Sequence, residues 1–179
     1  QAGSSLAQLA GLSHAGTRAM RYVVSFAAER DPAQRALRLL TQAPGVRFKV
    51  DVDPAWSDRD LRDLERLDCV EILDWKGRGS PRLLSAARQV FPQVLFEDPP
   101  AAISGPVSWD QSLRTGDDVA RACARGEAIN VKAPRMGGVL AALGALEHAR
   151  TSGVVAYVGG MFEVGPGRLQ ARCLAALPA

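Results

Sequence analysis

Short apolar runs recur along the chain, and a longer segment with helical spacing follows most of them. A short run rich in Val, Ile, Leu and Phe and bounded by turn residues is typical of a buried strand. The pattern predicts strands at 22–26, 46–52, 69–73, 93–96, 107–109, 128–131 and 154–158.

Residues that commonly begin helices stand between these runs. Asp31-Pro32 and Ser80-Pro81 each pair an N-cap residue with proline at the first helical position, and Ser57 followed by Asp60 resembles a capping box. In the first of these helices we expect Leu37, Leu39 and Leu40 to form the buried stripe. Later helices are expected at 117–125, 139–150 and 167–177.

Alternating strands and helices indicate βαβ units and a parallel sheet. Polar residues follow several of the strands, and no strand-linked Gly-x-Gly-x-x-Gly or phosphate-loop motif is present. The pattern therefore favours a TIM-like barrel over an open nucleotide-binding sheet. Gly-Gly pairs at 137–138 and 159–160 are expected to be tight turns, although such a pair can also hold an anion.

The segment between the fourth and fifth strands departs from this pattern. Only 100–106 separates the end of one strand region from the next, whereas a parallel crossover needs about a dozen residues or more. Three explanations are open: the strands are not adjacent and parallel, a helix has been lost, or a mobile segment is missing from the sequence.

Composition sets limits on the class of protein. The 179 residues suggest one domain, but a closed eight-stranded barrel usually takes about 250. The net charge of +3 is spread over Arg-rich helix faces, which does not indicate nucleic-acid binding. Three unpaired cysteines are expected to be free buried thiols. With no signal peptide or long apolar span, we expect a soluble cytoplasmic protein and no membrane partner.

Three acids follow apolar strand cores: Asp74, Glu97 and Asp110. On the rim of a barrel they would face a common centre, where like charges at close range require a cation. Hard oxygen ligands suit Mg²⁺ or Mn²⁺. Any one of these acids is more simply explained as a helix cap or a solvated loop charge, but their shared position favours a metal site.

Two lysines, Lys49 and Lys132, end strands on opposite sides of the inferred metal. A partly desolvated lysine beside a cation has a lowered pKa and can act as a base. The alternative is an ion pair with the same acids or a lysine that extends to solvent.

Several motifs resemble the enolase superfamily, in its muconate-lactonizing and o-succinylbenzoate-synthase branch. The runs INVKAPRMGG at 129–138 and GGMFEVGPGR at 159–168 resemble that branch's sixth- and seventh-strand motifs. Glu97-Asp98-Pro99 is similar to its Glu-x-Pro, and Asp110-Gln111-Ser112 to its Asp-Glu-Ser. Residues 1–12 resemble the helix that joins a capping domain to the barrel.

The resemblance implies a (β/α)7β barrel with Mg²⁺, or Mn²⁺, on Asp74, Glu97 and Asp110. It also implies Lys132 and Lys49 as catalytic residues and Glu163 as a substrate-binding residue. The domain expectation is 1–17 as the end of a helix and linker from a capping domain, and 18–179 as a partial barrel. Because the capping domain, fourth helix and eighth strand are missing from the pattern, the barrel would expose apolar surface. We therefore expect a fragment of a larger protein, missing segments, or association with another chain, and in the last case a homo-oligomer.

Two residues depart from the family pattern. The Lys-x-Lys of the second strand is here Lys49-Val50-Asp51, and Lys76 stands where asparagine usually follows the third-strand acid. Both are candidate substrate-binding residues, and Lys76 could replace the missing lysine or weaken metal binding.

The sequence thus favours an isomerase or lyase that removes a proton α to the carboxylate of a small-molecule substrate. The alternative is a divergent member with a binding or structural role and no such catalysis. A third hypothesis, an unrelated phosphate-binding barrel, is compatible with the Gly-Gly pairs.

Overall fold

The structure is a computed structural model that describes residues 21–177. These residues form two compact units, Arg21–Ser108 (the first unit) and 109–177 (the second unit). The predicted helix end and linker at 1–17 lie outside the described residues. No helix in the described range is long and apolar enough to cross a membrane.

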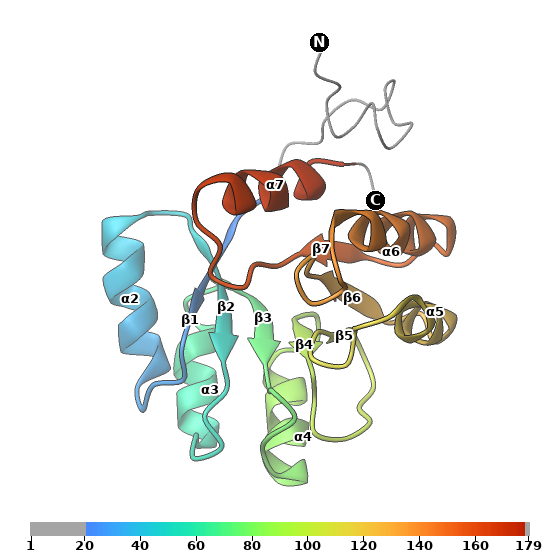
Figure 1. Ribbon diagram of the computed structural model, residues 1–179. Helices are drawn as coiled ribbons and strands as arrows, with labels where there is room; N and C mark the ends of the chain where they lie inside the picture. The colour runs from blue at the N-terminus through green and yellow to red at the C-terminus, as the bar shows by residue number, and fades with distance from the viewer. Residues whose placement is uncertain (1–20, 178–179) are drawn as a thin grey trace. The chain divides into compact units, whose positions relative to one another are not determined.

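The first unit is built from repeated βα pairs (Figure 1). Adjacent strands pair in parallel, and β4 pairs with the first residues of β5. The elements are β1 (Val23–Phe26), α2 (Pro32–Gln42), β2 (Arg47–Asp51), α3 (Asp58–Glu65), β3 (Val70–Asp74), α4 (Pro81–Val90), β4 (Leu95–Glu97) and β5 (Val107–Trp109).

Alternation along the strands separates a core face from a polar face. In β2, Phe48 and Val50 are buried in the core cluster that includes residues of the helices, whereas Lys49 and Asp51 point the other way. Leu73 of β3 and Phe96 of β4 belong to the same core. The strand-end acids therefore lie on the face that does not contact the helices.

The helices begin where the capping residues predict. The Asp31 carboxylate accepts from Gln34 N–H at 2.9 Å, and Ser57 and Asp60 form a complete capping box. The expected stripe of α2 is wrong in one residue: Ala33 and Ala36 are buried, but Leu37 is 50% exposed. Leu39 and Leu40 pack partly buried against the core. The small alanines allow the helix to approach the sheet closely, and they turn Leu37 outward.

The short connection after β4 contains no helix. Phe96 pairs with Val107 and Glu97 with Ser108 in parallel register, so the suggestion that these strands are not adjacent is wrong. Arg88 of α4 lies beside this connection, with its guanidinium 3.6 Å from the centre of the Phe96 ring. It donates to the Val94 and Pro106 carbonyls, both at 2.8 Å. A buried arginine thus joins the residue that precedes β4 to the residue that precedes β5, beside a connection that lacks a helix.

The second unit continues the alternation and has its own core. Its elements are α5 (Gly116–Ala124), β6 (Ala128–Val131), α6 (Val139–Thr151), β7 (Ala156–Val158) and α7 (Gly165–Ala175), and β6 and β7 pair in parallel. No strand follows α7 within the described residues. The cysteines are free, but Cys173 is exposed, which corrects the expectation that all three thiols are buried.

Together these elements are those of an incomplete TIM-like barrel. Each unit supplies parallel strands alternating with helices, as the sequence predicts. The helix that would follow β4 is absent, and the described range has no eighth strand. Exposed apolar side chains, among them Phe162, Val164 and Leu169, occur on and before α7.

Candidate functional site

Three acids of the first unit form a row across neighbouring strands. Asp51 pairs with Asp74 in the β2–β3 register, and Asp74 pairs with Glu97 in the β3–β4 register. Backbone hydrogen bonds continue past the strand ends, from Trp75 N–H to Glu97 O at 2.9 Å and from Val52 N–H to Asp74 O at 2.9 Å. The three carboxylates are therefore held side by side at the carboxyl ends of β2, β3 and β4.

Two lysines bridge this row. The Lys49 Nζ lies 2.9 Å from Asp74 Oδ2 and also contacts Glu97 Oε1. The Lys76 Nζ lies 2.8 Å from the same Asp74 Oδ2 and 3.0 Å from Asp51 Oδ1. The order of charges is therefore Asp51, Lys76, Asp74, Lys49, Glu97, and it alternates from one side chain to the next.

Burial makes these contacts strong. The side chains of Asp74 and Glu97 are 2% and 0% exposed, and that of Lys49 is 14% exposed. Burial by itself lowers the pKa of Lys49, but the charges of Glu97 and Asp74 outweigh it and raise that pKa. Likewise burial alone raises the pKa of Asp74, but the charge and hydrogen bonds of the two lysines bring it below its usual value. Both groups are thus held in their charged forms.

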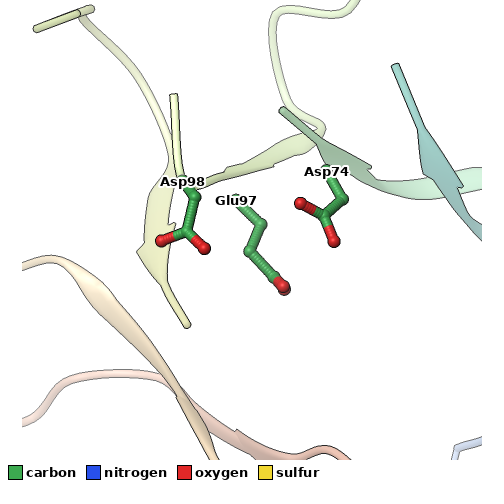
Figure 2. Close-up of side chains that lie close together, drawn as sticks. All are labelled: Asp74, Glu97 and Asp98. Atoms are coloured by element: carbon green, nitrogen blue, oxygen red, sulfur yellow. The ribbon is translucent and has the colours of Figure 1, made fainter. Parts of the chain in front are cut away.

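Asp98 adds a fourth carboxylate to this cluster. Successive strand residues point to opposite faces, so an extended Asp98 would direct its side chain away from Glu97. Its φ of +45° instead turns the backbone into the left-handed region. Figure 2 shows the carboxylates of Asp74, Glu97 and Asp98 gathered together. All three residues are buried, and each offers an oxygen within 4.8 Å of the others.

These side chains fit a divalent cation by the chemistry of their donors. We call Lys49, Asp51, Asp74, Lys76, Glu97 and Asp98 the acid-rich cluster. It contains four carboxylates against two ammonium groups, and carboxylate oxygens are the ligands that Mg²⁺ prefers. The Lys49 ammonium already shows that a positive charge is accommodated between Asp74 and Glu97. The two lysines also compete with any metal for these oxygens.

The other predicted ligand, Asp110, belongs to the second unit and has cationic partners there. Lys132 Nζ lies 2.7 Å from Asp110 Oδ2, and Arg135 Nη1 contacts Asp110 Oδ1 and donates to its carbonyl at 2.7 Å. We call Asp110, Lys132 and Arg135 the cation-rich cluster. All three side chains are at most 19% exposed. The cation-rich cluster thus has two positive side chains against one carboxylate.

Gly159 leaves room for Lys132. A Cβ at this position would lie 2.7 Å from Lys132 Cε and would collide with the Asn130 amide. Its φ is not in the left-handed region, in contrast to +89° and +132° at Gly137 and Gly138. Close approach, and not a tight turn, therefore requires glycine at 159.

Glu163, a predicted substrate-binding residue, folds back onto its own loop. Its Oε2 accepts from Met161 N–H at 2.6 Å. A side chain at Gly160 would meet the same oxygen at 2.7 Å. The carboxylate thus fixes the loop after β7 in this structure.

Sequence reasoning missed three residues of these clusters or their surroundings: Asp98, Arg135 and the requirement for Gly159. Asp98 lies in the Glu97-Asp98-Pro99 motif and Arg135 in the motif at 129–138, so the sequence showed that each position carries a charged residue. The turn at Asp98 and the contact of Arg135 with Asp110 were not visible, because each depends on backbone geometry or on long-range pairing.

Comparison with known proteins relates these features to a family. Residues 16–178 match the sequence profile of the C-terminal domain of DUF8230, a domain of unknown function. An o-succinylbenzoate synthase from Geobacillus kaustophilus is 29% identical in an alignment of 140 positions, and the match covers 68% of this chain and 37% of that protein.

Solved structures are similar over nearly the whole chain. A probable mandelate racemase from Alicyclobacillus acidocaldarius has a TM-score of 0.77 and 26% identity, and the match covers 95% of this chain and 50% of that one. An enolase-superfamily member of unknown function from Enterococcus faecalis has a TM-score of 0.77 and 22% identity, over 97% of this chain and 52% of that one.

The chain thus spans about half the length of these solved structures. Its match to the o-succinylbenzoate synthase spans little more than a third of that protein's length. The relatives include racemases, epimerases and o-succinylbenzoate synthases. The barrel elements agree with this assignment. The chain belongs to the family of the DUF8230 C-terminal domain and is a divergent barrel-domain member of the enolase superfamily.

Proposed function

We propose that this domain takes part in the metal-assisted removal of a proton α to a carboxylate, as an isomerase or lyase. The observation that carries the proposal is the in-register row of Asp51, Asp74 and Glu97, with the oxygens of Asp98 beside it. The names of the relatives, which include racemase and o-succinylbenzoate synthase, support this reaction class.

Mg²⁺, or Mn²⁺, would be held by Asp74 and Glu97, with Asp98 as a further oxygen donor. A proton beside a carboxylate is only weakly acidic, and its removal leaves a second negative charge. Bound to the substrate carboxylate, such a cation would stabilise the charge that develops there, which is worth several kcal/mol.

The lysines do the remaining chemistry. Lys132 is proposed to accept the proton or to stabilise the developing charge, after it exchanges its contact with Asp110 for the substrate. Lys49 is its proposed counterpart, because its ammonium already lies between two strand-end acids. Lys76, Asp51 and Glu163 are proposed to bind polar groups of the substrate. A small-molecule carboxylate, a cytoplasmic location and a homo-oligomeric state complete the proposal.

Solvent-deuterium exchange tests the reaction directly. The full-length protein is incubated with Mg²⁺ in D₂O with a panel of α-branched and α,γ-substituted carboxylates, and exchange at the α-carbon is followed by NMR. We expect exchange with at least one compound and a loss of about 10³-fold in Lys132→Ala. Arg121→Gln, which removes a surface charge of α5 paired with Asp118, is the matched control and should retain exchange.

A second candidate function is a binding or structural role without catalysis. The alternating row favours it, because Asp51, Asp74 and Glu97 each contact a lysine. Exchange that depends on Lys132 would exclude this role as the only function, whereas absence of exchange across the panel would contradict the catalytic proposal.

A further inference from the structure

The two residues that depart from the family pattern contact each other. Asp51 stands where the resemblance expects lysine, and Lys76 stands where it expects asparagine. The Lys76 Nζ lies 3.0 Å from Asp51 Oδ1, across the β2–β3 pair. The two departures are therefore one change: the positive charge has moved from the end of β2 to the end of β3, and a carboxylate has taken its former place.

Lys76 shares its other acceptor with Lys49. Both ammonium groups lie within 2.9 Å of Asp74 Oδ2, the oxygen of a proposed metal ligand. Two ammonium groups and a divalent cation cannot all remain at one oxygen, because the positive charges repel one another strongly at such distances. A cation that binds Asp74 must therefore displace at least one lysine.

Lys76 is the lysine better placed to leave. Its side chain is 32% exposed, against 14% for Lys49. Lys76 also has an acceptor, Asp51, that is not one of the proposed metal ligands. The contacts of Lys49 are to Asp74 and Glu97, which are both proposed ligands. Lys76 has a φ of +49°, which directs it out of the line of β3.

We propose that Lys76 competes with the divalent cation for Asp74, and that Asp51 holds Lys76 when the cation is bound. The Asp51–Lys76 pair then sets the affinity of the site for metal. This inference rests on the metal site of the proposed function. It goes beyond that function by giving the two departures one shared role, which is to keep Asp74 neutralised without a metal and to release it when a metal binds.

The competition predicts opposite effects for the two residues. Lys76→Asn removes the competing charge and tightens Mn²⁺ binding by about tenfold or more, because a positive charge beside the metal is lost. Asp51→Asn removes the second acceptor of Lys76, leaves the lysine on Asp74 and weakens binding by about tenfold. The third variant combines both substitutions. When Lys76 is already replaced by Asn, Asp51 has no lysine to hold, so adding Asp51→Asn changes the Mn²⁺ affinity by no more than about twofold to threefold.

Isothermal titration of the full-length protein and the three variants with Mn²⁺ measures these effects. Thermal unfolding in EDTA is a second readout: Lys76→Asn should lower the unfolding temperature without metal even as it raises the metal affinity. Circular dichroism verifies that each variant is folded. Arg47→Gln and Glu71→Gln are matched controls, since this ion pair joins the same two strands at their opposite ends with 2.7 Å between Arg47 Nε and Glu71 Oε1. Neither control should change Mn²⁺ affinity.

The outcomes separate this inference from the proposed function. If the wild type binds Mn²⁺ but the effects of the two substitutions on affinity are additive, the competition is overturned and the metal site remains. The same conclusion follows if the wild type binds Mn²⁺ and Lys76→Asn has no effect. Binding to Lys76→Asn but not to the wild type supports the competition and contradicts metal dependence of the natural protein. Binding to neither protein overturns both.

Discussion

The two units carry strand-end clusters with opposite charge balance. The acid-rich cluster of the first unit has four carboxylates and two ammonium groups. The cation-rich cluster of the second unit has one carboxylate, Asp110, with Lys132 and Arg135 against it. Both are largely buried, and both rest on parallel strands, so the difference lies in which charge is in excess.

That difference indicates two kinds of ligand. An excess of buried carboxylates attracts a cation, whereas an excess of lysine and arginine attracts an anion. A reaction that draws a proton from beside a carboxylate needs both kinds of group. In each cluster one buried side chain of the minority charge, Lys49 or Asp110, contacts two groups of the opposite charge, and its removal is expected to cost the most stability.

Removal of Lys49 should have the largest effect on the first unit. Lys49→Met leaves Asp74 and Glu97, both buried, without the ammonium between them. Breaking a buried pair from one side costs about 3–5 kcal/mol. Urea unfolding in EDTA measures the loss. Glu97→Gln is the matched control: it removes a majority charge and leaves Lys49 on Asp74, so it should cost about 1–2 kcal/mol. A larger cost for Glu97→Gln would contradict the assigned charge balance.

Removal of Asp110 is the corresponding change in the second unit. Asp110→Asn takes a carboxylate from two cations and should cost about 3 kcal/mol in the free energy of unfolding. Arg135→Gln leaves the Lys132–Asp110 pair in place and should cost about 1 kcal/mol. Equal losses in the two variants would show that Asp110 does not hold this cluster together.

The pH dependence of stability should single out Lys49. Burial lowers its pKa, but the charges of Glu97 and Asp74 outweigh burial and raise the pKa above its usual value. A raised pKa in the folded state stabilises the protein fully below the unfolded value of about 10.4, and the contribution is lost as pH rises through the folded pKa. The stability difference between wild type and Lys49→Met should therefore be constant from pH 7 to about pH 10 and shrink above it. A difference that shrinks between pH 7 and pH 9 would contradict this.

The capping boxes give the smallest effect and a comparison between the units. Ser57 caps α3 in the first unit, and Thr115 caps α5 in the second. Ser57→Ala and Thr115→Ala should each cost about 1 kcal/mol, because each leaves a helix N–H without its side-chain acceptor. Neither should change metal affinity. A change in affinity after Ser57→Ala would mean that the acid-rich cluster depends on the start of α3.

Local signals in the sequence were enough for most of the fold. The apolar runs and the cap residues Asp31, Ser57 and Ser80 predicted the elements to within a few residues, since strand and helix starts depend on neighbouring residues. Leu37 was misplaced because the approach of α2 to the sheet, through Ala33 and Ala36, is a tertiary effect.

Part of the candidate site could also be predicted from local signals in the sequence. Asp74 and Glu97 were found from their positions at strand ends, and the structure brings them together with Lys49. Lys49 was expected to end a strand, but it lies in the middle of β2, which continues to Asp51. The link between Asp51 and Lys76 was not visible, because it depends on the β2–β3 register and on a positive φ. Arg88 likewise was not singled out, because its contacts with the Val94 and Pro106 carbonyls depend on how β4 and β5 pair.

Titration of the full-length protein with Mn²⁺, followed by electron paramagnetic resonance, tests most directly whether the acid-rich cluster holds a divalent cation. We expect one Mn²⁺ per chain, a loss of about 100-fold or more in affinity in Glu97→Gln, and unchanged affinity in Glu71→Gln, which alters an acid near the other end of β3. No binding at millimolar Mn²⁺, or equal binding in wild type and Glu97→Gln, would contradict it.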